Sequence, residues 1–311
     1  MKYSPIPLEE IRAAQKRIAQ DVTRTPLVKL NVDDAPAEIY LKLENLTPIR
    51  SFKIRPASNA LRLMTKEQLE KGVWTSSAGN FAQGLAWVAR KLGVKCTVAL
   101  SENVPRNKLE KIQQLGAQTI QLPSEEYTKI YTERTHKDIE GTYVHPSSDL
   151  DVMAGGGTIG LEILEELPDV DSILVPWGIG GLTCGIASAV HAVNPEVKVY
   201  ACDEGNLTTA LNADKSEVTI SDDRLLQEVY DFGKQLFDGT IVTSAEERAD
   251  AIKMMIERNC VVAEDWSART VAAALSGRVG TRKIVCVITG GNIDISDLVK
   301  ILQGKTPQLS H

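Results

Sequence analysis

Apolar residues recur along the chain with the spacings of helices and of strands. The clearest helical spacing covers residues 80–92, where apolar side chains lie four, three and four residues apart and Gly93 follows. The apolar positions of this stretch are Phe81, Leu85, Val88 and Leu92. We therefore predict a helix that begins near Gly79 and ends at Gly93.

Short apolar runs of the strand type alternate with such helical stretches through most of the chain. The expected strands are Ile39–Leu43, Val73–Ser76, Cys96–Leu100, Thr119–Leu122, Ser172–Val175, Lys198–Cys202 and Ile284–Ile288. The expected helices include Leu8–Gln20, one that begins at Pro105, Thr158–Leu167, Leu182–Val193 and one that Ser244 and Glu247 cap. This alternation predicts an α/β fold with parallel sheets that helices cover on both faces. Such sheets bind ligands at the carboxyl ends of their strands.

The length of the chain suggests more than one domain, and its charge argues against nucleic-acid-binding and membrane-binding proteins. A chain of 311 residues suggests two domains, and a net charge of −6 gives no field that would attract nucleic acid or an anionic membrane. No apolar run approaches the roughly 18 residues that a membrane span needs, and the first residues lack a signal-peptide core. We therefore expect a cytoplasmic protein with no nucleic acid or membrane as partner.

Cysteine and histidine offer little catalytic chemistry. The five cysteines form no CxxC pair, and we expect most of them to be small buried residues in a reducing compartment. The four histidines are His136, His145, His191 and His311, and none has a partner at ligand spacing. A zinc site or a histidine-driven triad is therefore not expected.

The loop after the expected strand Ser172–Val175 is rich in glycine and leads directly into a helix. It contains Gly178, Ile179, Gly180, Gly181 and Leu182. Backbone N–H groups of such a loop can surround an oxyanion, and the helix N-terminus adds positive potential. A structural tight turn is the alternative. A dinucleotide fold is a weaker one, because only Asp203 supplies an acidic residue near the end of the next strand.

Two further turns place polar groups at the ends of strands. Ser76-Ser77-Ala78-Gly79-Asn80 joins a strand to a helix whose free amides could hold a carboxylate, although an ordinary helix cap is the alternative. Thr289-Gly290-Gly291-Asn292 places a hydroxyl at the end of a buried strand, and its glycines permit close approach of a ligand. A capping role would explain this second turn equally well.

Lys53 stands at the start of a helix that we expect to continue through Leu61. A lysine in this position is usually a solvated surface residue, and that remains the alternative. Phe52 and Ile54 flank it, however, and partial burial would lower its pKa towards that of a usable amine.

Taken together and in this order, five motifs resemble those of fold-type-II pyridoxal-phosphate enzymes of the threonine/serine dehydratase type, which include serine racemase-like and phenylserine dehydratase-like members. The motifs are residues 42–45 with 51–55, S-A-G-N-F-A-Q-G at 77–84, D-V-M-A-G-G-G-T-I-G-L-E at 151–162, V-P-W-G-I-G-G-L-T-C-G at 175–185 and T-G-G-N at 289–292. The similarity extends from about residue 24 to residue 294.

The resemblance implies a fold like that of the tryptophan synthase β subunit, with two open, parallel, twisted sheets and helices on both faces. It implies a large cofactor-binding domain over residues 1–68 and 146–311 and a small domain over residues 69–145. It also implies a homodimer. Residue 311 falls just after the catalytic domain, so we expect no C-terminal effector domain and no regulation by isoleucine.

The resemblance also implies a role for each motif position. Lys53 would carry pyridoxal 5′-phosphate and move the Cα proton, Phe52 would pack against the pyridine ring, and Asn80 would bind the 3-hydroxyl group. The phosphate would be held by Gly178, Ile179, Gly180, Gly181 and Leu182, and Thr289 would face the pyridine nitrogen. The substrate would lie against Ser77, Ala78, Gly79, Asn80 and Phe81.

A neutral hydroxyl at the pyridine nitrogen favours elimination over transamination. It cannot stabilise a protonated ring as a carboxylate would, so the electrons of the Cα–H bond are better expelled with a β-leaving group. We therefore expect elimination of a 3-hydroxy amino acid, threonine, serine or a bulkier analogue, to a 2-keto acid and ammonia.

Three departures from the family pattern affect the expected activity. Ala78 stands where racemases have a serine, which argues against racemisation. Phe81 replaces the usual histidine, and Glu264-Asp265-Trp266-Ser267-Ala268 replaces E-P-x-G-A, so a bulkier substrate such as a phenylserine becomes credible. Asp203 could serve a divalent metal, but Leu207 and Thr209 occupy the later positions, and we expect no metal.

Other functions stay open as alternatives. An amino-acid racemase or a β-replacement synthase could use the same scaffold, although synthases usually carry a threonine-rich phosphate loop. A catalytically silent binding protein or an unrelated nucleotide-binding oxidoreductase would lack the cofactor altogether.

Overall fold

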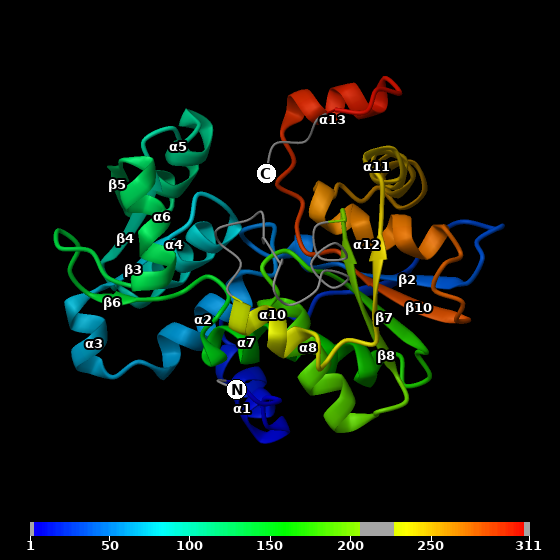
Figure 1. Ribbon diagram of the computed structural model, residues 1–311, viewed down its shortest axis with the longest axis horizontal. Helices are drawn as coiled ribbons and strands as arrows, with labels where there is room; N and C mark the ends of the chain where they lie inside the picture. The colour runs from blue at the N-terminus through cyan, green and yellow to red at the C-terminus, as the bar shows by residue number, and fades with distance from the viewer. Residues whose placement is uncertain (1–2, 206–226, 308–311) are drawn as a thin grey trace.

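The computed structural model describes residues 3–205 and 227–307, and within these ranges the strands form two separate sheets (Figure 1). The larger sheet has the strand order β1-β2-β10-β7-β8-β9. Its strands are β1 (Leu27–Lys29), β2 (Glu38–Lys42), β7 (Ser172–Pro176), β8 (Lys198–Asp203), β9 (Gly239–Val242) and β10 (Lys283–Val287).

The smaller sheet has the order β5-β4-β3-β6, and all its pairs are parallel. Its strands are β3 (Val73–Ser76), β4 (Cys96–Ser101), β5 (Gln118–Leu122) and β6 (Thr142–Tyr143). Because this sheet uses only residues 73–143, we propose that residues 69–145 form the small domain and that residues 1–68 and 146–311 belong to the large one.

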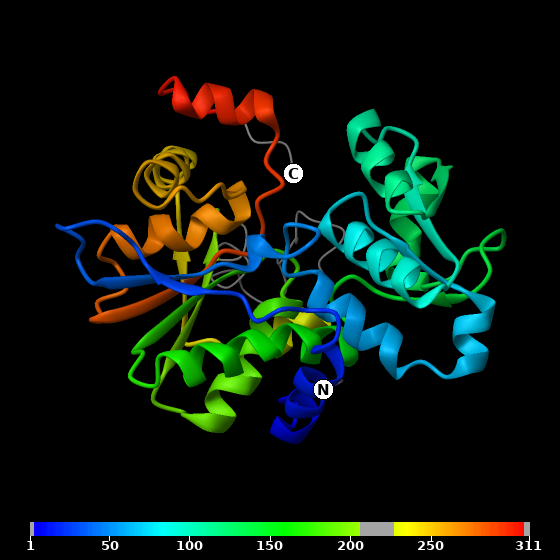
Figure 2. The same ribbon diagram turned by 180° about the vertical axis from the view of Figure 1, so that it is seen from behind.

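Helices cover both faces of the larger sheet, as Figures 1 and 2 show from opposite sides. One hydrophobic core lies between the sheet and a first helix layer, and a second core lies between the opposite face and a second layer. The first layer holds α1 (Leu8–Ile18), α7 (Leu150–Glu166), α8 (Gly181–Val193) and α10 (Gln227–Gly233). The second holds α11 (Ala245–Asn259), α12 (Asp265–Leu275) and α13 (Ile295–Leu302).

A third core joins the smaller sheet to the rest of the molecule through α2 (Ile54–Leu63), which packs against both α4 and α7. The remaining helices are α3 (Lys66–Lys71), α4 (Asn80–Leu92), α5 (Arg106–Gln114) and α6 (Ser124–Glu133), with the short 3₁₀ helix η1 (Glu44–Leu46) before α2. The predicted α/β class with helix-covered sheets is therefore confirmed.

One edge of the larger sheet departs from the all-parallel expectation, because β1 pairs with β2 in the antiparallel direction. The short connection between Lys29 and Glu38 explains this pairing. Two strands joined without a crossover can lie side by side only when they run in opposite directions.

The predicted helix over Thr158–Leu167 is wrong at its start, because α7 already begins at Leu150. The run Gly155-Gly156-Gly157 argues against a helix by propensity. In the structure these glycines allow close packing instead. A Cβ on Gly157 would lie 2.7 Å from the carbonyl oxygen of Gly185 in α8, and one on Gly155 would lie 2.7 Å from that of Arg55. Tertiary packing therefore overrides local propensity.

Other predicted elements are confirmed to within a few residues. Gly93 ends α4 with a left-handed backbone (φ 69°), and Ser244 and Glu247 form the predicted capping box of α11. The carboxyl ends of the parallel strands β2, β7, β8 and β10 meet at one edge of the larger sheet. The loops with unusual residues leave β7 and β10 at this edge.

Candidate active site

The lysine segment and the loop after β10 are joined by backbone contacts. Ser51 forms an isolated β-bridge with Gly290, and the Phe52 N–H donates a 2.9 Å hydrogen bond to the Thr289 carbonyl oxygen. Residues that are far apart in the sequence therefore lie next to each other at the carboxyl edge of the sheet. Lys53 and Thr289 are held in one site by this pairing.

The Lys53 amine lies among apolar and carbonyl groups. It donates a 2.7 Å hydrogen bond to the Pro146 carbonyl oxygen, and its Nζ lies 5.0 Å from the centre of the Phe52 ring and 5.3 Å from that of Phe81. Burial lowers the pKa of Lys53 to about 8. Roughly a tenth of such an amine is neutral at pH 7, far more than for an exposed lysine. A lowered pKa of this kind is what an amine needs in order to act as a nucleophile or base near neutral pH.

Asn80 begins α4, and hydrogen bonds fix both ends of its side-chain amide. Its Nδ2 donates to the Glu264 carboxylate at 2.9 and 3.1 Å, and its Oδ1 accepts from Asn292 Nδ2 at 2.8 Å. Burial raises the pKa of Glu264, and the bond from Asn80 only partly opposes this effect. These hydrogen bonds hold the Asn80 side-chain amide in one orientation at the start of α4.

The turn from β3 to α4 presents free backbone donors. No side chain caps α4, and the Ser77 hydroxyl accepts the Gly79 N–H at 3.3 Å within the turn itself. Ala78 lies between these two residues. The first amides of a helix point outward and attract an anion, so this turn can hold a carboxylate.

The glycine loop between β7 and α8 has the form of an anion cradle. Gly178 (φ 52°) and Gly180 (φ 87°) adopt the left-handed conformation that favours glycine, and no side chain caps α8. A Cβ on Gly181 would lie 2.3 Å from the Ser147 carbonyl oxygen. Ile179 is partly exposed between the glycines, whereas Leu182 packs into the core beneath them.

Thr289 is buried where β10 ends, and its hydroxyl oxygen lies 3.1 Å from the hydroxyl oxygen of Ser267 in α12. The site thus contains a half-buried amine, two uncapped helix N-termini and a buried neutral hydroxyl. This set suits a ligand that carries an aldehyde, a phosphate and a ring nitrogen.

Comparison with known proteins gives the family. The family model described as "Pyridoxal-phosphate dependent enzyme" matches residues 18–290. The chain belongs to this family. It is 37% identical to an L-threonine ammonia-lyase of Thermotoga maritima over 96% of this chain and 78% of the relative. It is 34% identical to the L-threonine dehydratase catabolic TdcB of Staphylococcus aureus over 96% of this chain and 92% of that protein.

The fold also matches a serine racemase of Dictyostelium discoideum, with a TM-score of 0.82 and 32% identity over 94% of this chain and 100% of that structure. The expected fold-type-II architecture is thereby confirmed. As a member of this family the protein uses pyridoxal 5′-phosphate, and the residues present fit that cofactor. The cradle at Gly178–Gly181 suits its phosphate and the Lys53 amine suits its aldehyde.

Among the predicted site residues, the contacts described above bring Lys53 next to Phe81 and next to the segment that contains Thr289. Phe81, which we expected to contact the substrate, is 2% exposed and packs within the third core. Its contact with the site is through the ring, whose centre lies 5.3 Å from the Lys53 Nζ. Pro146, whose carbonyl oxygen accepts a hydrogen bond from the Lys53 amine, belongs to none of the predicted motifs. Asn292 and Ser267 belong to predicted segments, but the sequence assigned neither of them a contact with Asn80 or Thr289.

Asp203, considered as a metal ligand, lies beside a buried guanidinium. The Arg269 Nη1 is 3.7 Å from its carboxylate, and the Asp203 Oδ2 accepts the Gly205 N–H at 3.0 Å. Leu207 and Thr209 fall outside the described residues. Within residues 3–205 and 227–307 no cluster of three or more His, Cys, Asp or Glu side chains is arranged to hold a metal ion.

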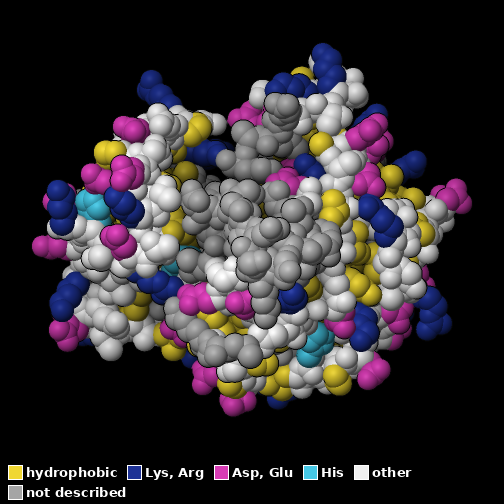
Figure 3. All heavy atoms as spheres, in the orientation of Figure 1, with side chains coloured by type: hydrophobic (Ala, Val, Ile, Leu, Met, Phe, Trp, Pro, Cys, Tyr) yellow, Lys and Arg dark blue, Asp and Glu magenta, His cyan; other side chains and the backbone are white. Residues whose placement is uncertain are grey.

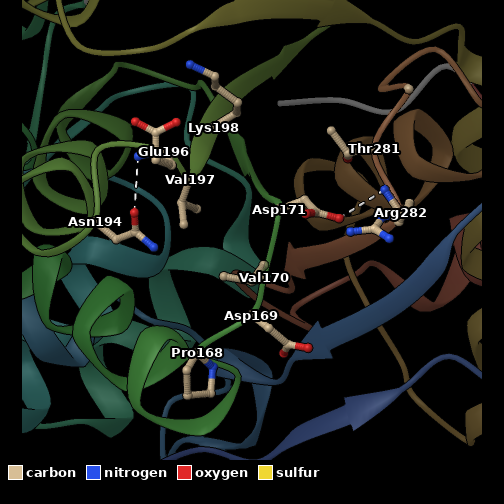
Figure 4. Close-up of a pocket in the computed structure, with 11 residues that line it drawn as sticks. Pro168, Asp169, Val170, Asp171, Asn194, Glu196, Val197, Lys198, Thr281 and Arg282 are labelled. Carbon is tan, nitrogen blue, oxygen red and sulfur yellow. Dashed lines mark hydrogen bonds between the residues drawn. The ribbon is translucent and has the colours of Figure 1, made fainter.

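An open cavity lies at the opposite edge of the larger sheet, around the amino ends of β7, β8 and β10 (Figure 4). Its Asp171 carboxylate accepts the backbone N–H groups of Arg282 and Lys283 at 3.1 and 2.8 Å. These contacts connect two loops, and the cavity lies away from the carboxyl ends where the family site is built.

On the face shown in Figure 3, basic and acidic side chains are interspersed. Among the helices that the structure describes, none has the length and apolar character to span a membrane.

The lowered pKa of Lys53 predicts its reactivity. Only the neutral amine reacts with an acylating reagent, so labelling of Lys53 in the cofactor-free protein should rise with pH and reach half its maximum near pH 8. Peptide mass spectrometry across pH 6–11, with the 92%-exposed side chain of Lys66 in the same digest as reagent control, measures this. Labelling of Lys53 that still rises steeply above pH 10 would contradict the assigned environment.

Proposed function

We propose that the protein converts an L-3-hydroxy amino acid to a 2-keto acid and ammonia by α,β-elimination of water, followed by hydrolysis of the resulting enamine. The observation that carries this proposal is the position of the Lys53 amine, half-buried, next to the Thr289 segment and 5.3 Å from the centre of the Phe81 ring in the first turn of α4. The relatives named threonine ammonia-lyase and threonine dehydratase support the same reaction class.

Each loop contributes one task to the proposed reaction. The amides at the start of α4, from Gly79 to Phe81, hold the substrate carboxylate, and those at the start of α8 hold the cofactor phosphate. The Asn80 side-chain amide binds the cofactor 3-hydroxyl, and Phe52 packs against the pyridine ring. Bound pyridoxal phosphate supplies the electron sink that accepts the electrons of the Cα–H bond.

Lys53 removes the Cα proton, since its amine is neutral in a useful fraction near physiological pH. Thr289 offers only a neutral hydroxyl to the pyridine nitrogen, which disfavours a long-lived negative charge at Cα. Departure of the β-hydroxyl group relieves that charge. The remaining enamine then hydrolyses in water to the keto acid and ammonia.

Racemisation is the second candidate, because the chain also resembles a serine racemase structure. It requires a proton donor on each face of the planar substrate. Lys53 serves one face, but the opposite turn offers the methyl group of Ala78. The hydroxyl oxygen of neighbouring Ser77 accepts the Gly79 N–H within its own turn. The methyl group of Ala78 has no proton to give, which favours elimination.

We further propose a cytoplasmic homodimer. Four of the five cysteines are buried free thiols, which suits a reducing compartment. Exposed apolar side chains on α13 and η1 offer a surface for a second copy, among them Ile295 (76% exposed) and Leu46 (60%).

The proposed reaction predicts that purified protein forms keto acid from L-threonine, L-serine or a bulkier L-3-hydroxy amino acid, and that Lys53→Ala lowers the rate roughly 10³-fold or more. A dehydrogenase-coupled assay over a substrate panel measures this, with Lys66→Ala as the control for loss of an exposed lysine. Wild-type activity in Lys53→Ala would remove the assignment of Lys53. A cofactor-loaded protein that produces no keto acid from any such substrate would remove the proposed reaction.

The role of Ala78 predicts the ratio of the two products. Wild type should form keto acid far faster than D-amino acid, and Ala78→Ser should raise the ratio of D-isomer to keto acid by about tenfold or more, because it adds a proton donor. Chiral chromatography of both products from L-serine tests this, with Ala78→Val as a variant that changes volume without adding a donor. D-serine appearing in wild type as fast as keto acid would favour the racemase alternative.

A further inference from the structure

The segment from residue 145 to residue 149 joins β6 to α7 in a tight turn built around the ring of His145. This ring is fully buried, and its Nδ1 accepts the backbone N–H groups of Ser147 at 3.1 Å and of Ser148 at 2.9 Å. The His145 N–H in turn donates to the Asp149 carboxylate at 2.8 Å. One side chain therefore determines the path of the backbone through this turn.

Two consecutive carbonyl oxygens of the turn contact two different parts of the site. The Pro146 carbonyl oxygen accepts the 2.7 Å hydrogen bond from the Lys53 amine. The Ser147 carbonyl oxygen lies against Gly181, the first residue of α8, where a Cβ would come within 2.3 Å of it. The turn thus contacts both the amine and the glycine loop, which come from segments far apart in the sequence.

Packing holds the His145 ring in one orientation. Tyr131 in α6 and Tyr143 in β6 meet it at nearly right angles, with ring centres 5.5 and 6.1 Å away. The Tyr143 hydroxyl oxygen lies 2.7 Å from that of Ser76, which ends β3. Because Pro146 follows, the backbone of His145 is also restricted to extended conformations. The smaller sheet therefore supports the turn from below.

The hydrogen bonds of His145 limit what its ring can do. A ring nitrogen that accepts N–H groups carries no proton, so the proton of this imidazole lies on Nε2. Two backbone donors occupy Nδ1, which is therefore not available to take a proton from a substrate. The contribution that this nitrogen can make to the reaction is to position the turn.

We propose that His145 is a positioning residue whose Nδ1 fixes the turn and thereby sets the Lys53 amine relative to the amides at the start of α8. This inference rests on the proposed function, in which Lys53 moves a proton and those amides hold the cofactor phosphate. A rotation of the peptide groups in the turn would displace the Pro146 and Ser147 carbonyl oxygens together. The amine and the phosphate cradle would then lose their relative position, and small misplacements of reacting groups are costly in rate.

Three variants separate the acceptor nitrogen from the bulk of the ring. His145→Leu removes the acceptor. His145→Asn restores it, because the asparagine Oδ1 lies as many bonds from the backbone as Nδ1 and can accept both N–H groups. Val144→Ala is the matched control, since Val144 is the preceding residue and is 2% exposed within the third core. This change lowers the stability of the same segment and leaves the acceptor in place.

The first measurement is amide hydrogen exchange of the cofactor-free protein, well below its unfolding temperature. The peptide that contains Ser147 and Ser148 should exchange about tenfold faster in His145→Leu, because both amides lose their acceptor. In His145→Asn and in Val144→Ala its exchange rate should stay close to that of wild type.

The second measurement is the affinity for pyridoxal 5′-phosphate, followed by absorbance as the cofactor is added. The affinity should fall about tenfold in His145→Leu and stay within about threefold of wild type in His145→Asn and in Val144→Ala. The rate of keto-acid formation at saturating cofactor should follow the same order. A role in stability alone would not separate His145→Leu from Val144→Ala in these measurements.

Three results would count against His145 or against the reaction. If folded His145→Leu keeps the wild-type amide exchange and cofactor affinity, the inference is wrong. If His145→Asn is impaired as much as His145→Leu, the packing of the ring matters and its acceptor does not, and the inference is also wrong. Should His145→Leu fail to fold, His145→Phe replaces it, because it keeps a ring between the two tyrosines and has no acceptor. Wild type that binds the cofactor but forms no keto acid would remove the proposed function, whereas the exchange and affinity measurements would still decide the role of His145.

Discussion

Two buried carboxylates hold the Arg55 guanidinium, and this ion-pair network determines where the lysine helix begins. Arg55 binds Glu44 at 2.7 and 2.8 Å and Glu162 at 2.7 and 2.9 Å, and Lys42 binds Glu162 from β2 at 2.8 Å. Burial alone would raise the pKa of Glu162, but the bonds and charge of Arg55 lower it, so the carboxylate stays ionised. Removing one partner of such a pair costs about 3–5 kcal/mol, because the other charge is left buried.

The network fixes Lys53 because Arg55 lies in the same first turn of α2. Close contact with α4 completes the arrangement, since a Cβ on Gly84 would lie 2.7 Å from the Lys53 carbonyl oxygen. The helix that presents Asn80 therefore packs directly on the backbone of Lys53. The charged residues around Lys53 thus position the amine without touching it, and the chemistry is left to neutral and backbone groups.

Much of this could be predicted from local pattern. The glycine-rich loop after a predicted strand pointed to Gly178 and Gly180, which have left-handed backbones. Phe52 and Ile54 indicated partial burial of Lys53, which the structure confirms. Other features depend on contacts between distant segments. The start of α7 at Leu150 could not be predicted, because the glycines in its first turns have low helix propensity and are there for close packing. The contact between Ser267 and Thr289 forms only because α12 packs against β10 in the folded protein. Local spacing contains no information about such contacts.

The account depends most on the assignment of Lys53 as the residue that carries the cofactor. Borohydride reduction of the yellow holoenzyme, followed by digestion and peptide mass spectrometry, tests it directly. We predict that the mass of the reduced cofactor appears on the peptide containing Lys53 and on no other lysine peptide. The cofactor mass on a different lysine, or protein purified with added pyridoxal phosphate that shows neither colour nor a modified peptide, would contradict the account.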